Sequence, residues 1–135
     1  MMSIGDYVKI GGRAWNVRVT AIEETFAVLY SENNGRTLGD GAPMVLDPLG
    51  TCYGHKVTFE RVADNASEYD MLFDYLSRPR NAGIPVEIVH NQTTISYDAY
   101  VTSGNRALRK IRNSGVVDWE QMEIEFVPIR AQVTT

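Results

Sequence analysis

Several features that often reveal a protein's class are scarce or missing in this sequence. Its 135 residues include one cysteine, Cys52, so no disulfide can form within the chain, which is typical of a reducing compartment. No apolar run approaches the roughly 20 residues of a membrane-spanning helix. The first residues also lack the basic lead and apolar segment of a signal peptide. These absences predict a soluble single domain (residues 1–135), made in a cytoplasm and without membrane contact.

Strong charge and catalytic motifs are missing too. The 13 basic and 17 acidic residues give a net charge of −4, whereas duplex-binding domains are usually basic. The sequence has no glycine-rich phosphate-binding motif and no nucleophile elbow. His55, His90 and Cys52 would begin a zinc site, but the further ligand that zinc needs has no recognisable spacing. We therefore expect no metal, no cofactor and no small-molecule substrate.

The sequence does contain a repeated alternation of apolar and polar residues, which is the pattern of half-buried β-strands. Gly11 and Gly12 separate the first two such segments and predict a tight hairpin. The third segment favours a strand, although its Ala-Ile-Glu-Glu start also suits a helix. Asn91 and Gln92 lead into a second predicted hairpin. The expected strands are Tyr7–Ile10, Ala14–Val19, Ala21–Tyr30, His55–Val62, Pro85–His90, Thr94–Thr102 and Trp119–Ile129.

One α-helix is predicted from about Ser67 to Arg78. Proline cannot continue a helical hydrogen-bond ladder, so Pro79 marks its end. Apolar side chains recur three and four residues apart and form one stripe, made of Tyr69, Leu72, Phe73 and Leu76. The stripe predicts a helix packed on a sheet. The fold class is therefore mainly β (α+β), an antiparallel β-sandwich or half-open barrel of about seven strands flanked by one helix.

A glycine-rich segment from about Ser31 to Gly54 interrupts the strands. It holds five glycines and two prolines, which favours a long loop with at most a short strand near Pro43–Leu46. Connections of about twenty residues are uncommon in compact domains. Two interpretations remain open, a functional loop and a disordered hairpin tip.

Four carboxylates crowd the segment VVDWEQMEIEFVPIRAQ (Val116–Gln132), at Asp118, Glu120, Glu123 and Glu125. In a strand, Glu123 and Glu125 would stand about 7 Å apart, within the range of an inverting glycosidase pair. Catalytic carboxylates, however, usually come from different elements around a cleft, and at least one is partly buried. The segment is better explained as an amphipathic strand with a wet acidic face.

Alternation assigns the two faces of this closing strand. Met122, Ile124 and Phe126 fall on the face that we expect to be buried. Trp119 falls on the opposite face with the two glutamates. Glu120 falls on the apolar face, where it would mark a frayed strand start or pair with an arginine.

A basic run, GNRALRKIRNSG (residues 104–115), precedes the closing strand. Its cations are Arg106, Arg109, Lys110 and Arg112. They would suit a phosphate backbone, but the acidic net charge argues against nucleic-acid binding. The run favours either an exposed connection with an apolar underside or a charge-complementary contact with a neighbouring subunit.

Three stretches follow one another in a recognisable order: the helix EYDMLFDYLSRP, the hairpin VEIVHNQTTISYDAYVTS and the ending LRKIRNSGVVDWEQMEIEFVPIRA. This order resembles small tail proteins of phages and prophages of Gram-positive bacteria, over about Ile4 to Arg130. Those proteins often carry a Glu-Tyr-x-x-Leu helix that ends near a proline. They also close with an aromatic-led strand after a basic, asparagine-containing turn, here Asn113 before Trp119 and Phe126.

The resemblance implies a tail-tube-like fold, found in tail tube, distal tail and baseplate proteins, and a non-enzymatic role in hexameric rings. DNA would pass through the ring only as cargo, other tail proteins would be the partners, and the location would be the virion tail. Glu123 and Glu125 would face a lumen or a neighbouring subunit. The glycine-rich loop would reach another subunit or ring through Asn34, Gly35, Arg36, Leu38, Asp40 and Met44. The alternatives are a small carbohydrate- or peptide-binding β module and, less favoured, a β-rich hydrolase that uses the carboxylates.

Overall fold

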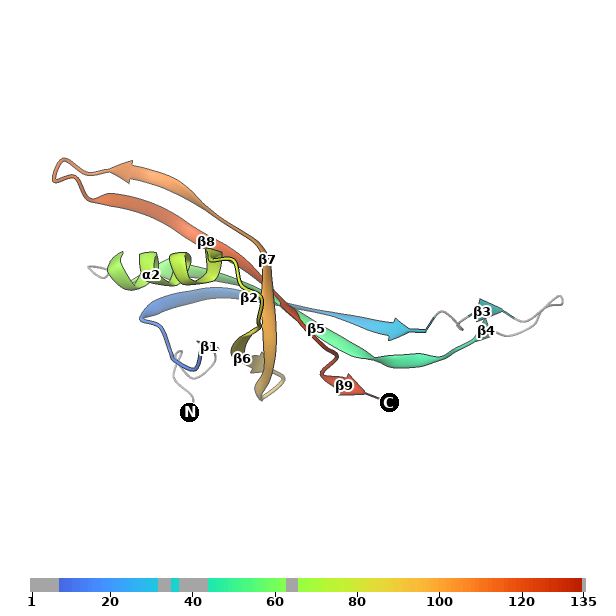
Figure 1. Ribbon diagram of the computed structural model, residues 1–135. Coiled ribbons are helices and arrows are strands. Elements are labelled where there is room, and N and C mark those ends of the chain that lie inside the picture. Colours follow the sequence, from blue (N-terminus) through green and yellow to red (C-terminus); the bar gives the residue numbers. More distant parts are fainter. Residues whose placement is uncertain (1–7, 32–34, 37–43, 63–65, 135) are drawn as a thin grey trace.

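Antiparallel β-strands dominate the computed structural model, which describes residues 8–31, 35–36, 44–62 and 66–134 (Figure 1). Seven strands form one open sheet in the order β1-β6-β7-β8-β5-β2, with β9 paired to β5. Among the described residues, one helix flanks this sheet and a second sheet joins β3 to β4. The predicted mainly-β fold with about seven strands and one helix is confirmed. The elements are β1 (Val8–Ile10), β2 (Val17–Tyr30), β3 (Gly35–Arg36), β4 (Met44–Val45), β5 (Pro48–Arg61), α2 (Ala66–Ser77), β6 (Ile84–His90), β7 (Thr93–Ile111), β8 (Val117–Pro128) and β9 (Val133–Thr134).

The sheet curves because the chain ties its two ends together. β1 and β2 lie at opposite ends of the strand order, yet only residues 11–16 separate them along the chain. The indole of Trp15 donates a hydrogen bond to the Ile10 carbonyl (2.9 Å) within this link. Since all seven strands belong to one sheet, the architecture is closer to a half-open barrel than to a sandwich of two sheets.

The turn at Gly11 and Gly12 forms, but the hairpin predicted around it does not. Both glycines have positive φ angles, 65° and 82°, a conformation that glycine adopts without steric cost. Ile10 and Arg13 form an isolated bridge across the turn. Beyond this bridge β1 pairs with β6 and β2 pairs with β5. The alternation identified strands correctly, but it carries no information about distant partners.

The second predicted hairpin is confirmed. β6 and β7 pair in unbroken register from Ile84 opposite Ala99 to His90 opposite Thr93. Asn91 takes a positive φ of 53° in the turn, which asparagine tolerates better than most residues.

The closing strand also lies as predicted over most of its length. Met122, Ile124 and Phe126 of β8 are all buried, and they stand opposite Phe59, Val57 and His55 of β5. The helix covers the same core with its apolar stripe, of which Tyr69, Leu72 and Leu76 are buried. It begins and ends within one residue of the expected bounds.

A bulge in β8 overturns the predicted position of Trp119. Arg106 of β7 stands opposite Met122, but Leu108 stands opposite Trp119, so β8 holds one extra residue in this interval. Glu120 and Gln121 are therefore both exposed, while Trp119 is half-buried against the core. Alternation alone assumes an unbroken strand, and the bulge breaks it.

Two long hairpins project from the body to opposite sides (Figure 1). We call them the β2–β5 arm (residues 25–30 and 48–54) and the β7–β8 arm (residues 104–111 and 117–121). The first corrects the predicted loop, because Pro48–Gly54 belongs to β5 and pairs with β2. The second corrects the predicted basic connection, because β7 continues to Ile111. In both segments, pairing with a distant strand overcomes the local preference for a loop, which comes from glycines in the first and from surface charge in the second.

Candidate functional site

The β2–β5 arm exposes apolar side chains and carries no charged residue along either strand. β5 leaves its partner β8 at His55, so beyond that point the arm is held by its own pairing and by β9 at Gly50 and Thr51. Exposed apolar side chains follow the arm on β2 and β5. They are Phe26 (71% exposed), Leu49 (53%), Tyr30, Leu29 and Val28. Alternation places Phe26, Val28 and Tyr30 on one face of β2, and a row of exposed apolar side chains on one face is typical of an interface.

The C-terminal segment braces this arm. The side-chain amide of Gln132 donates to the Tyr53 carbonyl (2.8 Å), and its oxygen accepts from the Tyr53 amide (2.9 Å). This two-way contact and the short strand β9 attach the chain end to β5. The arm is therefore supported at its middle while its apolar side chains stay exposed.

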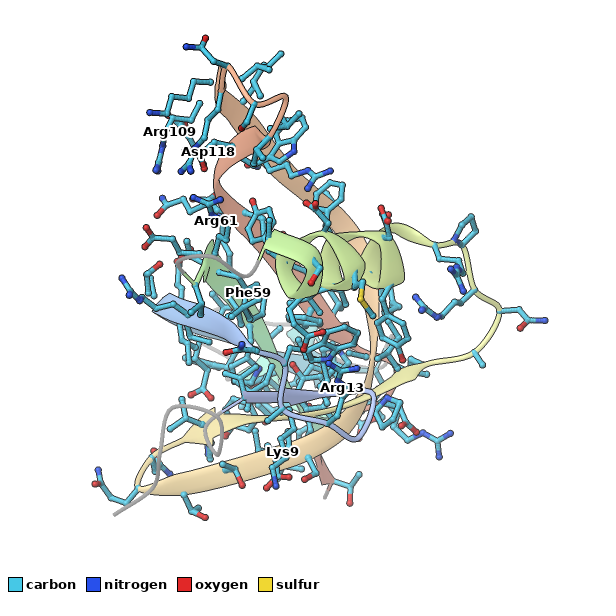
Figure 2. All side chains as sticks on the ribbon, turned by 90° about the vertical axis from the view of Figure 1, so that its left-hand side faces the viewer. Lys9, Arg13, Phe59, Arg61, Arg109 and Asp118 are labelled. Atoms are coloured by element: carbon cyan, nitrogen blue, oxygen red, sulfur yellow. The ribbon has the colours of Figure 1, made fainter. Side chains whose placement is uncertain are left out.

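The β7–β8 arm carries the basic run, but only part of that run is available to a partner. Arg106 bonds Asp70 (3.0 Å) and lies over the rings of Phe73 and Trp119, with its guanidinium carbon 3.9 and 4.1 Å from their centroids. Arg106 is thus part of the body and not of a charged patch. Arg109, by contrast, is exposed at the outer end of the arm (Figure 2).

Asp118 ties the outer part of this arm to the end of β5, a role that the sequence did not suggest. Its carboxylate is almost fully buried and lies 3.1 Å from an Arg61 nitrogen and 4.0 Å from one of Arg112. Figure 2 shows Arg61, at the end of β5, below Asp118. Arg112 is therefore partly neutralised, whereas Arg109 and Lys110 have no ion pair with any residue that the structure describes. A contact between residues this far apart leaves no local signal in the sequence.

Glu123 and Glu125 lie on the outer face of the sheet, as expected. Glu125 stands opposite Lys56, which in turn stands opposite Glu23 of β2. The Lys56 ammonium lies 3.4 Å from the Glu123 carboxylate. Glu23, Glu123 and Glu125 surround one lysine, so this face has a negative net charge. Thr58, which stands opposite Glu123, is buried.

The predicted loop contact is only partly described. Gly35 and Arg36 pair with Val45 and Met44 in the small β3–β4 sheet at the end of the β2–β5 arm. The other three residues assigned to this contact, Asn34, Leu38 and Asp40, lie outside the described residues.

A polar cluster at the root of the β2–β5 arm brings the two histidines together. One oxygen of Glu24 lies 2.8 Å from His55 Nε2 and 2.8 Å from His90 Nδ1. On the other side of the His55 ring, Nδ1 lies 2.7 Å from the Tyr97 hydroxyl. A carboxylate only accepts, so His55 donates through Nε2–H and Tyr97 donates to the bare Nδ1. Four strands, β2, β5, β6 and β7, meet in this cluster.

Burial and hydrogen bonding set the protonation of the cluster. Desolvation lowers the pKa of His55, and the hydrogen bond and charge of Glu24 oppose this without overcoming it. Burial alone would raise the pKa of Glu24, but the hydrogen bonds from His90 and His55 outweigh it and lower that pKa. Burial raises the pKa of the Tyr97 hydroxyl well above its usual range. At neutral pH the cluster therefore holds a neutral His55 and an ionised Glu24.

No local pattern in the sequence identifies this cluster. The zinc-site hypothesis places the histidines with Cys52, whereas their actual partner, Glu24, lies 31 and 66 positions away along the chain. Only the curvature of the sheet brings β2 to β6. Among the described residues, no three His, Cys, Asp or Glu side chains are placed to hold a metal ion.

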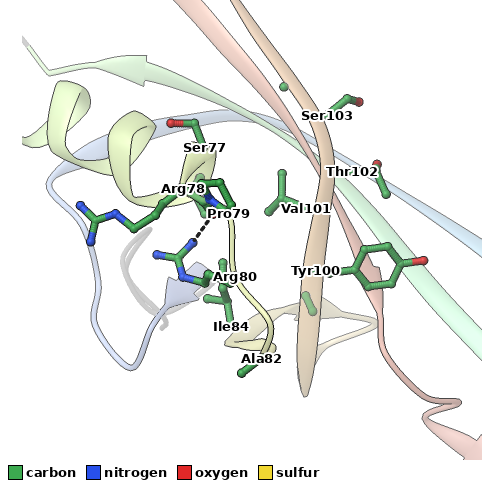
Figure 3. Close-up of a pocket in the computed structure, with 13 residues that line it drawn as sticks. Ser77, Arg78, Pro79, Arg80, Ala82, Ile84, Tyr100, Val101, Thr102 and Ser103 are labelled. Carbon is green, nitrogen blue, oxygen red and sulfur yellow. Dashed lines mark hydrogen bonds between the residues drawn. The ribbon is translucent and has the colours of Figure 1, made fainter.

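A groove of about 470 Å³ lies beside β7, next to the segment that follows α2 (Figure 3). β6 pairs with β7 only as far as Ala99, and no described strand continues on that edge. Ile84 and Val101 contribute apolar side chains to the lining. An open strand edge above an apolar floor is the arrangement to which extended peptides add.

Comparisons with known proteins do not assign this chain to a family. No protein-family model matches the sequence, and the comparison with curated proteins finds no match. No described helix is long and apolar enough to cross a membrane.

Proposed function

We propose that this chain is a non-enzymatic structural protein of a bacteriophage or prophage tail. It assembles with copies of itself into a ring, expected to be a hexamer, and stacks on other tail proteins of the virion. DNA passes through as cargo, and the protein acts in the tube, tail tip or baseplate. The resemblance in the order of elements supports this role.

The β2–β5 arm is the observation that carries the proposal. Its two strands expose a run of apolar side chains without a single charge, and nothing in the described chain covers them. Burying each such side chain at an interface is worth about 1.5–3 kcal/mol. In a single copy these side chains stay exposed to water, whereas assembly would bury them and be stabilised by that free energy.

Charge supports a head-to-tail contact between copies. The β7–β8 arm presents Arg109 and Lys110, and the outer sheet face presents Glu123 and Glu125. These surfaces differ within one copy, so a contact between them is heterologous, and heterologous contacts generate closed rings or open filaments.

Light scattering and electron microscopy of the purified chain test the proposal. We expect a concentration-dependent ring that is weakened when Arg109→Glu and Lys110→Glu are combined. Because the charges are complementary, mixing this variant with a Glu123→Lys, Glu125→Lys variant should restore association. If the wild type assembles and each charge-reversal variant assembles equally well, the ring is supported but this charged contact is excluded.

A chain that stays monomeric at high concentration with its neighbours present would contradict the proposed function. The alternative is a small β-rich carbohydrate- or peptide-binding module, and the groove beside β7 favours its peptide-binding form. A monomer whose melting temperature rises with an added extended peptide would support that alternative.

A further inference from the structure

We propose that Glu24, His55, His90 and Tyr97 form an acid-sensitive clasp that fixes the direction of the β2–β5 arm, and that acid releases it. The inference goes beyond the proposed assembly, because arm direction is a property of a single chain. The two can fail separately.

The clasp lies at the point where the arm leaves the sheet. Towards the arm, His55 is the outermost residue of β5 that pairs with β8, and Glu24 stands opposite it on β2. From here outward β5 no longer pairs with β8. The cluster therefore ties the root of the arm to His90 of β6 and Tyr97 of β7, on the far side of the curved sheet.

The hydrogen bonds of the clasp are complete only while His55 is neutral. Its Nε2–H donates to Glu24 and its bare Nδ1 accepts from Tyr97. A proton on Nδ1 would turn that acceptor into a donor, so the Tyr97 hydroxyl would have to rotate and accept, and its own hydrogen would lose its partner. Since His55 is 1% exposed, water does not solvate the added charge.

Charged side chains also lie on the outer side of the cluster. Glu23, Lys56 and Glu125 line a small cavity of about 220 Å³ that also touches His55. They come from β2, β5 and β8, and Lys56 stands between the two acids in the strand order. On the arm side the His90 ring lies against Tyr53, with 4.9 Å between ring centroids.

The direction of the pH effect follows from the two lowered pKa values. In a released arm His55 is solvated and its pKa returns towards about 6.5, above its value in the clasp. The released form therefore binds the proton more readily, so acid favours release and the clasp is complete above this pH. The lowered pKa of Glu24 adds a second step in the same direction at lower pH.

Distances between two spin labels measure the release directly. One label at Phe26→Cys reports the arm and one at Met71→Cys reports the helix, in a chain carrying Cys52→Ser; both labelled positions are exposed. We expect one distance at about pH 7.5 and a second population growing towards about pH 5. Its ratio to the first should rise by up to about tenfold per pH unit, the limit for one proton.

A matched pair of variants separates the clasp from general acid effects. Glu24→Ala removes the shared acceptor and should show the second population at both pH values. Glu23→Ala, its neighbour on the outer face, should behave as the wild type. Should Glu24→Ala not fold, Tyr97→Phe replaces it, because it removes only the hydroxyl that donates to His55. A single distance at both pH values in the wild type, or equal behaviour of the two glutamate variants, would overturn the proposal.

Discussion

Arg106 lies among aromatic rings, although the sequence places it in a basic run. Its guanidinium bonds Asp70 and stacks on Phe73 and Trp119, so one cation joins the helix to the root of the β7–β8 arm. Arg109, three positions along the same run, is exposed. Arginines of one run thus have different roles, packing for Arg106 and exposure for Arg109. The bulge in β8 causes this difference, because it turns Trp119 inward, where Arg106 stacks on it.

Replacing these two arginines separates their roles. Arg106→Ala should lower the free energy of unfolding by about 2 kcal/mol, since it removes three cation–π contacts and a charged hydrogen bond. Arg109→Ala should change it by no more than about 0.5 kcal/mol, as is usual for exposed side chains. Urea denaturation followed by tryptophan fluorescence measures both, and equal losses would contradict the assignment.

At the scale of elements, the closeness of β9 to the β2–β5 arm depends on a glycine. A Cβ at Gly50 would lie 2.4 Å from the Val133 carbonyl oxygen, which is closer than any real contact. At Gly54, four residues along the same strand, a Cβ would meet nothing nearer than 3.4 Å. The first glycine is required by packing, and the second is not.

Gly50→Ala should therefore detach β9 while leaving the core folded. We expect faster amide hydrogen exchange at Thr51 and Val133, with unchanged protection at Val57 and Ile124 in the core. Gly54→Ala is the control and should keep the protection of β9. Protection that survives in Gly50→Ala would show that β5 and β9 can separate slightly without losing their pairing.

At the scale of the whole molecule, the body has a buried apolar core, whereas the β2–β5 arm has none. The core is closed by the helix and the curved sheet, whereas the β2–β5 arm exposes apolar side chains to water. This contrast favours the β2–β5 arm as the apolar part of the proposed association, beside the charged contact with the outer sheet face.

Polar replacement on the arm should weaken association without loss of fold. Phe26→Ser combined with Leu49→Ser removes two exposed apolar side chains, so the dissociation constant should rise at least about 100-fold. Met71→Ser, at a helix position that is 51% exposed, should leave association unchanged. Analytical ultracentrifugation over a dilution series measures the difference, and equal dissociation constants would place the interface elsewhere.

The sequence by itself determined the local elements. Strict alternation and a three-four apolar stripe predicted most strands, the helix, the β6–β7 hairpin and the buried face of Met122, Ile124 and Phe126. These features depend on neighbours along the chain, so their pattern is readable without a structure. The acidic outer face of β8 was predicted for the same reason.

Only the tertiary structure decided what depends on distant partners. The pairing of β1 with β6, the continuation of β5 through a glycine-rich segment and the bulge before Met122 each follow from how the sheet closes on its core. The same curvature brings Glu24 to both histidines and Asp118 to Arg61. Those side chains lie far apart in the sequence, and no local pattern encodes a contact that sheet curvature creates.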